Sequence, residues 1–537
     1  MSSTRRIRPV DFAHPGTFNR ARRGLVENYF ESGFRYSSTL AAHDSCVNAL
    51  VYSKLGGRFL ASGGDDRRIL LWDLHRETSS EDSVQPSCTF LGHRVCYFRG
   101  ADSCAPRGGT DDTILKFDLN RWTTFPEPGH SDSAAAQVFG QHADSIREVS
   151  CHPSQEDVFL SASDDGCILL HDGRDGSRMS QAQGTLQHTT EITGVRFHPR
   201  MEHIFATSDN KGKVCLRDMR MAFGPLHQRS QEGVVLQFAT TLVKKGIELQ
   251  GYYRPEASSI SFDSEGTKLA VVLLHYYPTI YSIKYPYPLA TCSGSNLPDG
   301  SPVPPGTRKF SNSCTVKHGS FGGEANGDDC YAFGSDDFRG YVWKIPPLQH
   351  LEEQRTVINN HDNYGRDTTS GTIAFTDGRK RSDAYVPVDL STPLFHLNGH
   401  KSIVNTALIH PVYPLIMTSG IERHIFMHSP TPSTPCASNL SLTPTEVRKL
   451  LEASAESRRR FMLAMMGTPV DSLDPGGELG QDGASIELFD EILRQEGEAD
   501  LFRAATLSTT GSDSDFEEDN MLRSDDEENQ DDDLVMD

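Results

Sequence analysis

Short stretches of alternating apolar and polar residues recur along most of the chain. The runs from Cys46 to Tyr52 and from Ile192 to Phe197 are two examples. A period of two is typical of β-strands that bury one face. Turn residues separate these runs at short intervals, so the pattern predicts an all-β body built from many short strands.

Two landmarks repeat at fixed distances within this pattern. A turn aspartate stands six residues before an aromatic or histidine position at Asp66 and Trp72, Asp111 and Phe117, Asp165 and His171, and Asp337 and Trp343. A histidine precedes the first strand of five units, at His43, His93, His142, His188 and His400. The histidine stands 23 residues before Asp66 and Asp165, and 22 residues before Glu422. Such regular offsets indicate an internal repeat.

Units of about 45 residues with four short strands each are the signature of WD-repeat propeller blades. The sequence therefore predicts a seven-bladed WD-repeat β-propeller over residues 34–430, with six or eight blades as alternatives. The blades are expected at residues 43–75, 93–120, 142–174, 188–220, 257–284, 311–345 and 400–429.

Two details of this ring can be predicted. The last blade needs an outer strand, because an open sheet edge invites aggregation, and residues 34–40 are the candidate. His93 stands only 18 residues before Asp111, about one strand less than in the sibling units. We therefore expect blade 2 to be locally distorted, either because it lacks a strand or because the sequence has lost a piece.

Insertions and terminal extensions flank the repeats. Insertions are expected at residues 222–256, 285–310 and 346–397, the last of them mostly disordered. The other regions are a basic arm with a helix over residues 17–30 (domain 1–33), a linker (431–442), a helical extension (443–498) and an acidic disordered tail (499–537). Within the extension, Thr443 as N-cap predicts a helix to about Met466, and a second helix is expected over residues 485–495. These two helices either pack on the propeller or bind a partner.

The repeated polar residues have a structural interpretation. A histidine, a strand hydroxyl and a turn carboxylate at constant spacing can form one buried hydrogen-bonded network per blade. A catalytic or metal site would occur once instead of in several blades. The predicted network residues are His43, Asp66, Trp72, His142, Asp165, Asp337, Trp343 and His400.

No residue pattern points to catalysis or to a cofactor. The sequence has no phosphate-binding loop, dinucleotide fingerprint, zinc-protease motif or nucleophile elbow. Its eleven cysteines lie eight or more residues apart, which excludes closely spaced zinc pairs and argues against a disulfide framework. We expect a non-enzymatic binding scaffold in the cytoplasm or nucleus, with no metal, cofactor, membrane or direct nucleic-acid partner.

The charge is concentrated at the ends of the chain. The net charge is −21, and residues 511–537 hold thirteen Asp or Glu against one Arg. By contrast, residues 1–23 hold six Arg and one Asp. Such runs are typical of solvated, disordered tails.

Two consecutive blades end in a motif that resembles a known family. Asp172-Gly173-Arg174 and Asp218-Met219-Arg220 are similar to the Trp-Asp-x-Arg ending of WD-repeat substrate receptors of cullin-4 RING ubiquitin ligases. In that family the Arg contacts damage-specific DNA-binding protein 1, the triple-propeller adaptor. The resemblance implies that Asp172, Arg174, Asp218 and Arg220 bind the adaptor, although His171 and Arg217 replace the Trp.

The resemblance extends over about residues 17–430, most specifically to the factor-five type of DDB- and cullin-4-associated factors. The runs 44–50, 62–72, 312–317, 334–346 and 398–405 carry it. It implies a non-catalytic receptor that bridges the adaptor and cullin-4 to a protein substrate, with helix 17–30 inserted in the adaptor. The alternative is a WD-repeat scaffold of a chromatin or RNA-processing complex without ligase activity.

Overall fold

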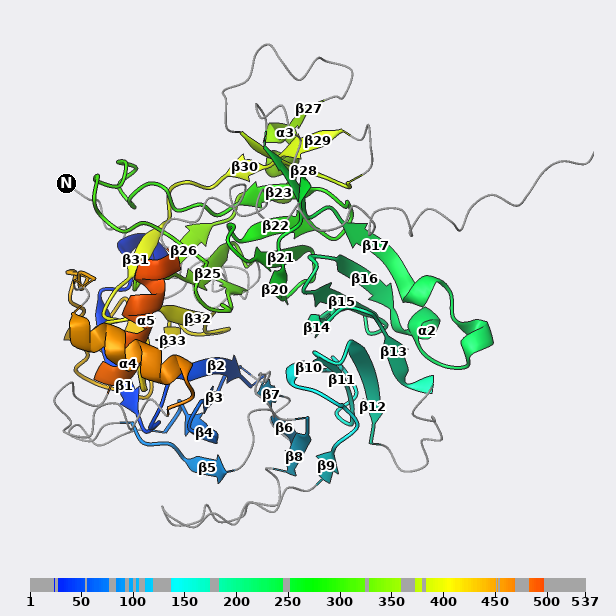
Figure 1. Cartoon of the computed structure of the whole chain (residues 1–537), viewed down its shortest axis with the longest axis horizontal. Coiled ribbons are helices and arrows are strands. Elements are labelled where there is room, and N and C mark those ends of the chain that lie inside the picture. Colours follow the sequence, from blue (N-terminus) through cyan, green and yellow to red (C-terminus); the bar gives the residue numbers. More distant parts are fainter. Residues whose placement is uncertain are drawn as a thin grey trace, which may run out of the picture.

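The computed structural model describes residue 24 and residues 28–53, 56–76, 84–91, 96–99, 103–105, 112–118, 137–173, 183–244, 252–323, 328–358, 372–378, 383–450, 452, 454–468 and 482–496. Seven sheets in this part of the chain are arranged radially as the blades of a propeller, and an eighth lies outside the ring (Figure 1). The prediction of an all-β WD-repeat propeller is therefore confirmed.

Four consecutive antiparallel strands form each of the four regular blades. Blade 1 contains β2 (Val47–Tyr52), β3 (Phe59–Gly64), β4 (Arg68–Asp73) and β5 (Cys88–Leu91). Blade 3 contains β10 (Ile146–Cys151), β11 (Val158–Ser163), β12 (Cys167–Asp172) and β13 (Thr185–Gln187). Blade 4 contains β14 (Ile192–Phe197), β15 (Ile204–Asp209), β16 (Val214–Asp218) and β17 (Val234–Phe238). Blade 5 contains β20 (Ala257–Phe262), β21 (Lys268–Leu273), β22 (Thr279–Ser282) and β23 (Pro288–Thr291).

The outer strand of a blade often lies beyond the range expected from the repeat. Blade 6 shows this most strongly, because β24 (Ser320–Gly322), β25 (Cys330–Gly334) and β26 (Gly340–Lys344) are joined by the distant β31 (Phe395–Leu397). In blade 4 the outer strand β17 lies within the predicted insertion 222–256. Outer strands are short and carry no landmark residue, so the repeat pattern stops at the third strand.

Blade 7 closes the ring with a strand from the start of the chain. It contains β32 (Val404–Ile409), β33 (Ile416–Gly420) and β34 (His424–Ser429), and β1 (Tyr36–Ala41) pairs antiparallel with β34. The register runs from Tyr36 opposite Ser429 to Ala41 opposite His424. The predicted closing strand is therefore confirmed.

The predicted linker, residues 431–442, lies against this last blade. Within it, β35 (Ser441–Leu442) pairs with the free edge of β1. Cys436 and Leu440 are buried in the same apolar cluster as Met427. The segment therefore continues the packing of blade 7.

Blade 2 differs from its neighbours in strand order. Its strands are β6 (Cys96–Arg99), β7 (Ser103–Ala105), β8 (Ile114–Asp118) and β9 (Gln137–Phe139), in the spatial order β7, β6, β8, β9. As a result β6 and β8 run parallel. The hairpin of β6 and β7 thus occupies the two inner positions, with β7 innermost instead of β6. This confirms the predicted distortion of blade 2.

Two insertions meet in the eighth sheet. β18 (Thr241–Lys244) and β19 (Tyr252–Tyr253) follow blade 4, whereas β27 (Thr356–Ile358), β28 (Ile373–Thr376) and β29 (Ala384–Val386) follow the third strand of blade 6. β18 pairs antiparallel with β28. The insertion also contributes α3 (Leu348–Gln354) and β30 (Val388–Asp389), which pairs parallel with β23. The prediction that residues 346–397 are mostly disordered is wrong for the described residues, because each insertion supplies the partner strand that the other lacks.

The first predicted C-terminal helix begins later than the sequence indicates. α4 spans Ala455–Met465, and Ser454 caps it by accepting a hydrogen bond from the Ser457 amide at 2.9 Å. Residues 443–450 are not helical, so the capping motif at Thr443 does not start a helix. The physical reason is tertiary, since Val447 and Leu450 pack on the propeller from a segment that is not helical. The second predicted helix is present as α5 (Gly483–Glu496).

The described part of the predicted N-terminal helix, Gly24 and residues 28–32, is helical. Phe30 and Phe34 are buried against Phe395 of β31, with ring centroids 6.1 and 5.0 Å from that ring. The start of the ring is therefore anchored on blades 6 and 7. The remainder of residues 17–30 lies outside the described residues.

Most described cysteines are free thiols: Cys46, Cys88, Cys167, Cys215, Cys292, Cys314, Cys330 and Cys436. Cys151 is disulfide-bonded. The sequence argued against a disulfide framework, and the bond at Cys151 is an exception to that expectation.

Candidate functional site

Buried hydrogen-bonded networks occupy blades 1, 3 and 7. In each, one ring nitrogen of a histidine lies 2.9 Å from a turn carboxylate oxygen, and the other lies 2.6–2.8 Å from a hydroxyl on the second strand. The three sets are His43, Asp66 and Ser62; His142, Asp165 and Ser161; and His400, Glu422 and Thr418. The constant spacing in the sequence therefore corresponds to a constant geometry.

The ionisation of these groups is what a structural network requires. Burial raises the pKa of Asp66, but hydrogen bonds from His43 and two backbone amides outweigh it and lower that pKa to about 2. Burial lowers the pKa of His142, against the opposing effect of Asp165. A histidine that resists protonation and a carboxylate that is fully satisfied are poor candidates for acid–base chemistry.

A donor on the third strand completes each network. Trp72 Nε1 donates to Ser62 Oγ at 2.9 Å. Where the tryptophan is replaced, another side chain reaches the equivalent hydroxyl at 2.8–3.0 Å: His171 to Ser161, His428 to Thr418 and Arg217 to Thr207. Arg217 is buried and also donates to the Glu232 carbonyl at 2.8 Å. The two departures from tryptophan at the family motif thus preserve one hydrogen bond.

Blade 6 is built differently from the predicted network. Asp337 accepts a hydrogen bond from Tyr341 Oη at 2.6 Å, and Trp343 Nε1 has no hydrogen-bond partner among the described residues. The structure therefore does not bring Asp337 and Trp343 into one network. Burial raises the pKa of Asp337, although Arg339 and its hydrogen bonds act in the opposite direction.

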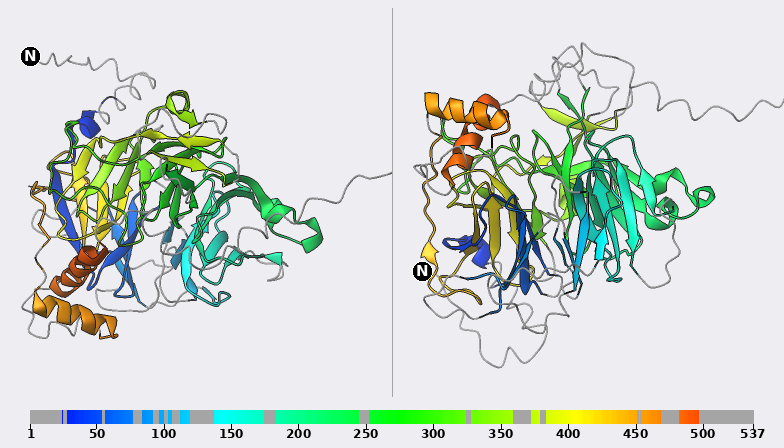
Figure 2. Two further views of the ribbon diagram at one scale, coloured as in Figure 1. Left: turned by 45° about the horizontal axis from the view of Figure 1, so that its top comes forward. Right: turned by 60° about the horizontal axis from the view of Figure 1, so that its bottom comes forward.

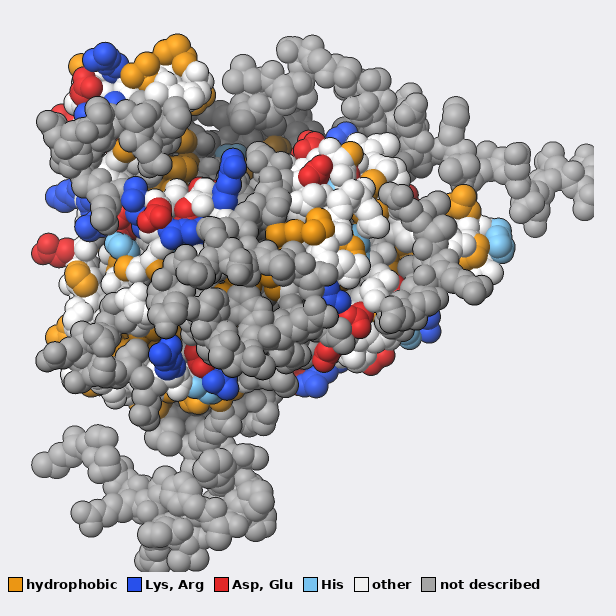
Figure 3. All heavy atoms as spheres, turned by 90° about the horizontal axis from the view of Figure 1, so that it is seen from below, with side chains coloured by type: hydrophobic (Ala, Val, Ile, Leu, Met, Phe, Trp, Pro, Cys, Tyr) orange, Lys and Arg blue, Asp and Glu red, His pale blue; other side chains and the backbone are white. Residues whose placement is uncertain are grey.

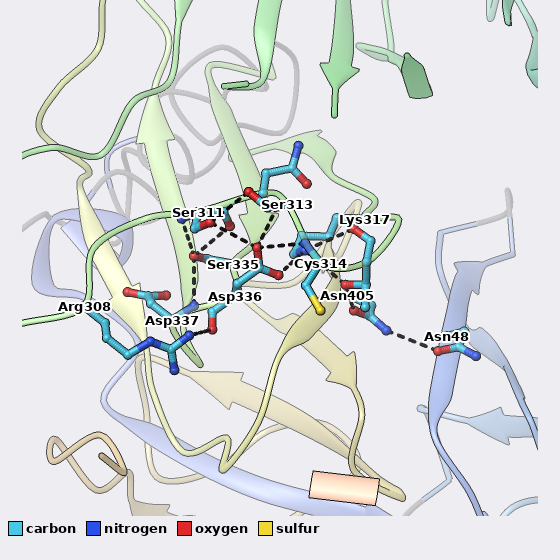
Figure 4. A network of polar contacts seen from close by, with 12 residues as sticks. Asn48, Arg308, Ser311, Ser313, Cys314, Lys317, Ser335, Asp336, Asp337 and Asn405 are labelled. Atoms are coloured by element: carbon cyan, nitrogen blue, oxygen red, sulfur yellow. Dashed lines mark hydrogen bonds and ion pairs between the residues drawn. The ribbon is translucent and has the colours of Figure 1, made fainter. Parts of the chain in front are cut away.

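A buried ion pair takes the place of the histidine in blade 6. Lys317 Nζ lies 2.5 Å from Asp336 Oδ1, and the two side chains are 0% and 1% exposed. Asp336 also accepts the Ser313 amide at 2.7 Å, and Lys317 donates to the Thr315 carbonyl at 3.1 Å (Figure 4). The repeat pattern in the sequence did not predict this pair. The available signal was Cys314, which stands 23 residues before Asp337, at the spacing where blades 1 and 3 have a histidine.

The network of blade 6 continues into its neighbours. Thr315 donates to Asn405 of β32 at 2.7 Å, and Asn405 donates to Asn48 of β2 at 3.2 Å (Figure 4). Polar contacts therefore connect the inner edges of blades 6, 7 and 1.

The predicted adaptor-binding residues lie where the third strands end. Asp218 caps the short helix α2 (Met219–Ala222) and is buried. Arg220 donates to it twice, at 3.1 and 2.7 Å, and its side chain is 66% exposed. Asp172 ends β12, and Arg174 lies outside the described residues. Arg220 is therefore held by a buried carboxylate with its guanidinium open to solvent.

The opposite end of the blades carries the C-terminal extension. We call residues 443–450 the C-terminal arm. Val447 and Leu450 of the arm, and Phe489 and Leu493 of α5, pack on an apolar cluster formed by Cys46, Phe338, Ile403 and Ile421. α4 and α5 lie together over this face (Figure 2). Packing on the propeller, one of the two predicted roles of these helices, is thus observed for α5.

Phe338 is the main support of the arm. The guanidinium carbons of Arg308 and Arg448 lie 4.2 and 4.8 Å from its ring centroid. Its φ angle is 74°, and the equivalent turn residue in blade 3 is Gly166 at 76°. A side chain in this left-handed region costs about 1–2 kcal/mol, so the strain is offset by the packing of a fully buried phenyl ring.

We expect Arg448→Met to release α5 from the propeller. Arg448 donates to both carboxylate oxygens of the buried Asp490, at 2.7 and 2.6 Å. Loss of this pair should destabilise the docked state by about 1–3 kcal/mol. Amide hydrogen exchange in Gly483–Glu496 should therefore accelerate by about ten- to a hundredfold.

Arg459→Met is the matched control, because Arg459 is 74% exposed and its ion pair with Glu456 is long at 4.0 Å. Unchanged exchange in α5 of the Arg448 variant would show that the pair does not hold the helix.

Other chemistry finds no support in the described residues. No group of three His, Cys, Asp or Glu side chains there is placed to hold a metal ion. None of the described helices is long and apolar enough to span a bilayer. Among the described residues that are visible in Figure 3, acidic, basic and hydrophobic side chains are interspersed.

Comparison with known proteins identifies the repeat. The family model "WD domain, G-beta repeat" matches residues 34–73, which cover the closing strand and the first three strands of blade 1. This part of the chain is a WD repeat.

Comparison with curated proteins places it near one kind of WD-repeat protein. It is 27% identical over 492 residues to "DDB1- and CUL4-associated factor 5" of Mus musculus, covering 91% of this chain and 42% of that protein. The Homo sapiens protein of the same name is 26% identical over 492 residues, with 91% and 43% covered. "WD and tetratricopeptide repeats protein 1" of Mus musculus is 27% identical over 167 residues, or 31% of this chain and 23% of that protein. The factor-five resemblance is confirmed, and the chain spans less than half the length of those relatives.

Proposed function

We propose that this protein is a non-catalytic substrate receptor of a cullin-4 RING ubiquitin ligase. It would bridge damage-specific DNA-binding protein 1 to a protein substrate, and bond formation would remain with the other ligase subunits. The similarity to factor five over 91% of the chain supports this role. The observation that carries it is the exposed, rigidly held Arg220 at the end of a blade whose motif resembles that of adaptor-binding receptors.

The geometry of Arg220 suits an interface contact. Because Asp218 is buried and grips the guanidinium through two hydrogen bonds, little side-chain entropy remains to be lost on binding. Exposed arginines of this kind are frequent hot spots. The pKa of Asp218 is consistent with this contact, because the hydrogen bond from Arg220 lowers that pKa although burial raises it.

Two faces are available for two partners. Arg220 follows the third strand of blade 4, whereas the C-terminal extension packs on turns between second and third strands, at the other end of the blades. A receptor of this design would hold the adaptor at the first face and a substrate at the second. Bringing the substrate close to the ligase raises its effective concentration, which is the receptor's whole contribution.

The test is an affinity purification with the full chain. We expect the adaptor and cullin-4 to co-purify with the wild type. Arg174→Ala together with Arg220→Ala should reduce the amount of co-purified adaptor by at least about tenfold. If the N-terminal helix inserts in the adaptor, removal of residues 1–35 should also reduce the amount of co-purified adaptor. This truncation also deletes most of the segment that precedes β1.

Arg459→Ala is the control, since this exposed arginine lies on α4. Undiminished adaptor in the double variant, or recovery of other stable partners without any adaptor, would reject the receptor role. The second result would favour a scaffold without ligase activity.

A further inference from the structure

A cavity of about 280 Å³ lies at one end of the central axis, between the propeller and α5. Its wall includes Asn48, Thr193, Ser258 and Asn405, which belong to the innermost strands of blades 1, 4, 5 and 7. Innermost strands of neighbouring blades contact one another around the axis (Figure 1). We call this cavity the channel mouth.

Negative charge dominates the channel mouth. Asp65 and Glu256 line it, and Arg147 is the one Arg or Lys among the described lining residues. Arg147 is already engaged, because its Nε donates to Asp164 at 2.6 Å. Glu256 also lines the cavity and forms no ion pair among the described residues, although the charge of Arg147 acts on it.

Glu256 is the least satisfied of these groups. It is half-buried, and its carboxylate accepts no hydrogen bond from the described residues. Burial raises the pKa of Glu256, Arg147 lowers it, and Glu191 and Asp164 raise it further, so the net direction is upward. A positive charge placed in the cavity would relieve this repulsion.

The opposite end of the channel provides a contrast. The cavity there, about 310 Å³, also has charged residues in its wall, but these are paired. Arg196 binds Glu148 at 2.7 Å, and Asp263 binds Lys268 at 3.0 Å. Unbalanced charge is thus a property of the mouth beside α5 and not of the channel in general.

An aromatic ring forms part of the same wall. Phe489 of α5 lines the cavity. The next residue, Asp490, is held by Arg448 of the C-terminal arm, which keeps the helix against the propeller. A ring face beside carboxylates attracts a flat cation, and a guanidinium can bind two carboxylates while stacking on a ring.

We propose that the channel mouth binds an arginine side chain presented by an extended segment of the protein substrate. The inference rests on the proposed receptor function, and it names the chemistry that its second face would recognise. The volume is at the lower limit of small-molecule pockets, so one side chain and part of its backbone fit it better than a cofactor does.

The test uses the purified full chain and two fluorescein-labelled pentapeptides. One has the sequence Gly-Ser-Arg-Ser-Gly, and the other has citrulline, which is isosteric but uncharged, in place of arginine. Fluorescence anisotropy at low ionic strength should show at least about tenfold tighter binding of the arginine peptide, because a charge-assisted contact is lost with citrulline. Added salt should reduce this difference.

Two substitutions locate the binding. Glu256→Gln and Phe489→Ala should each lower the affinity for the arginine peptide by about five- to tenfold. Glu202→Gln, an exposed position between β14 and β15, is the charge-matched control and should leave the affinity unchanged. Equal binding of the two peptides, or full affinity in the Glu256→Gln variant, would overturn the proposal.

The peptide assay needs no adaptor, so the arginine site and the receptor role can be rejected independently of each other. Arginine selectivity without adaptor binding would reject the receptor role and keep the site. Adaptor binding without arginine selectivity would do the reverse.

Discussion

Lys317→Met is expected to destabilise the propeller by about 3–5 kcal/mol. The substitution leaves the carboxylate of Asp336, which is 1% exposed, without its ion-pair partner and with only neutral hydrogen-bond donors such as the Ser313 amide. An uncompensated buried charge is among the most costly defects in a protein core. Urea unfolding should therefore show a large fall in the midpoint.

A double variant separates the charge from the packing. Lys317→Met combined with Asp336→Asn removes both charges and should recover at least half of the lost stability. Lys344→Met is the matched control, because Lys344 is 53% exposed and lies 3.9 Å from Asp329. A change below about 1 kcal/mol for Lys317→Met alone would mean that water or a rearranged side chain satisfies Asp336.

Stability is expected to fall steeply between pH 7 and pH 5. Burial, followed by the nearby His142 and His400, lowers the pKa values of His171 and His428 to about 3. In the unfolded chain these histidines titrate near 6.5. Because the unfolded state then binds more protons than the folded state, stability is fully present above pH 6.5 and is lost as pH falls toward 3.

The size of this effect follows from the shift. His171 and His428 should each reduce the free energy of unfolding by about 2 kcal/mol at pH 5 relative to pH 7.5, or by about 4 kcal/mol together. Carboxylates such as Asp66 do not contribute in this window, because their linkage begins only as pH approaches 3.8. Urea unfolding at pH 7.5, 6 and 5 measures the slope directly.

His428→Gln tests the assignment, since an amide can still donate to Thr418 and does not titrate. Between pH 7.5 and pH 5 the His428→Gln variant should therefore lose about 2 kcal/mol less stability than the wild type. The exposed His203 provides the control substitution, His203→Gln. An unchanged pH dependence in the His428 variant would assign the acid sensitivity to other groups.

The sequence alone was sufficient for the repeat and for what the repeat imposes locally. Asp66 and Asp165 stand 23 residues after a histidine because two strands and two turns separate them, and the structure brings each pair to 2.9 Å. The closing strand β1 was predictable because an unpaired sheet edge is unfavourable. Period-two alternation and turn chemistry act over a few residues, so they can be read without knowing the fold.

Tertiary structure decided which distant segments meet. β18 pairs with β28 from another insertion, and Lys317 finds Asp336 only where a histidine is missing. The arm around Arg448 is not helical although its sequence begins with a helix cap, because Phe338 and α5 hold it against the ring. Local preferences are worth about 1 kcal/mol, and burial of apolar surface between segments far apart in the chain outweighs them.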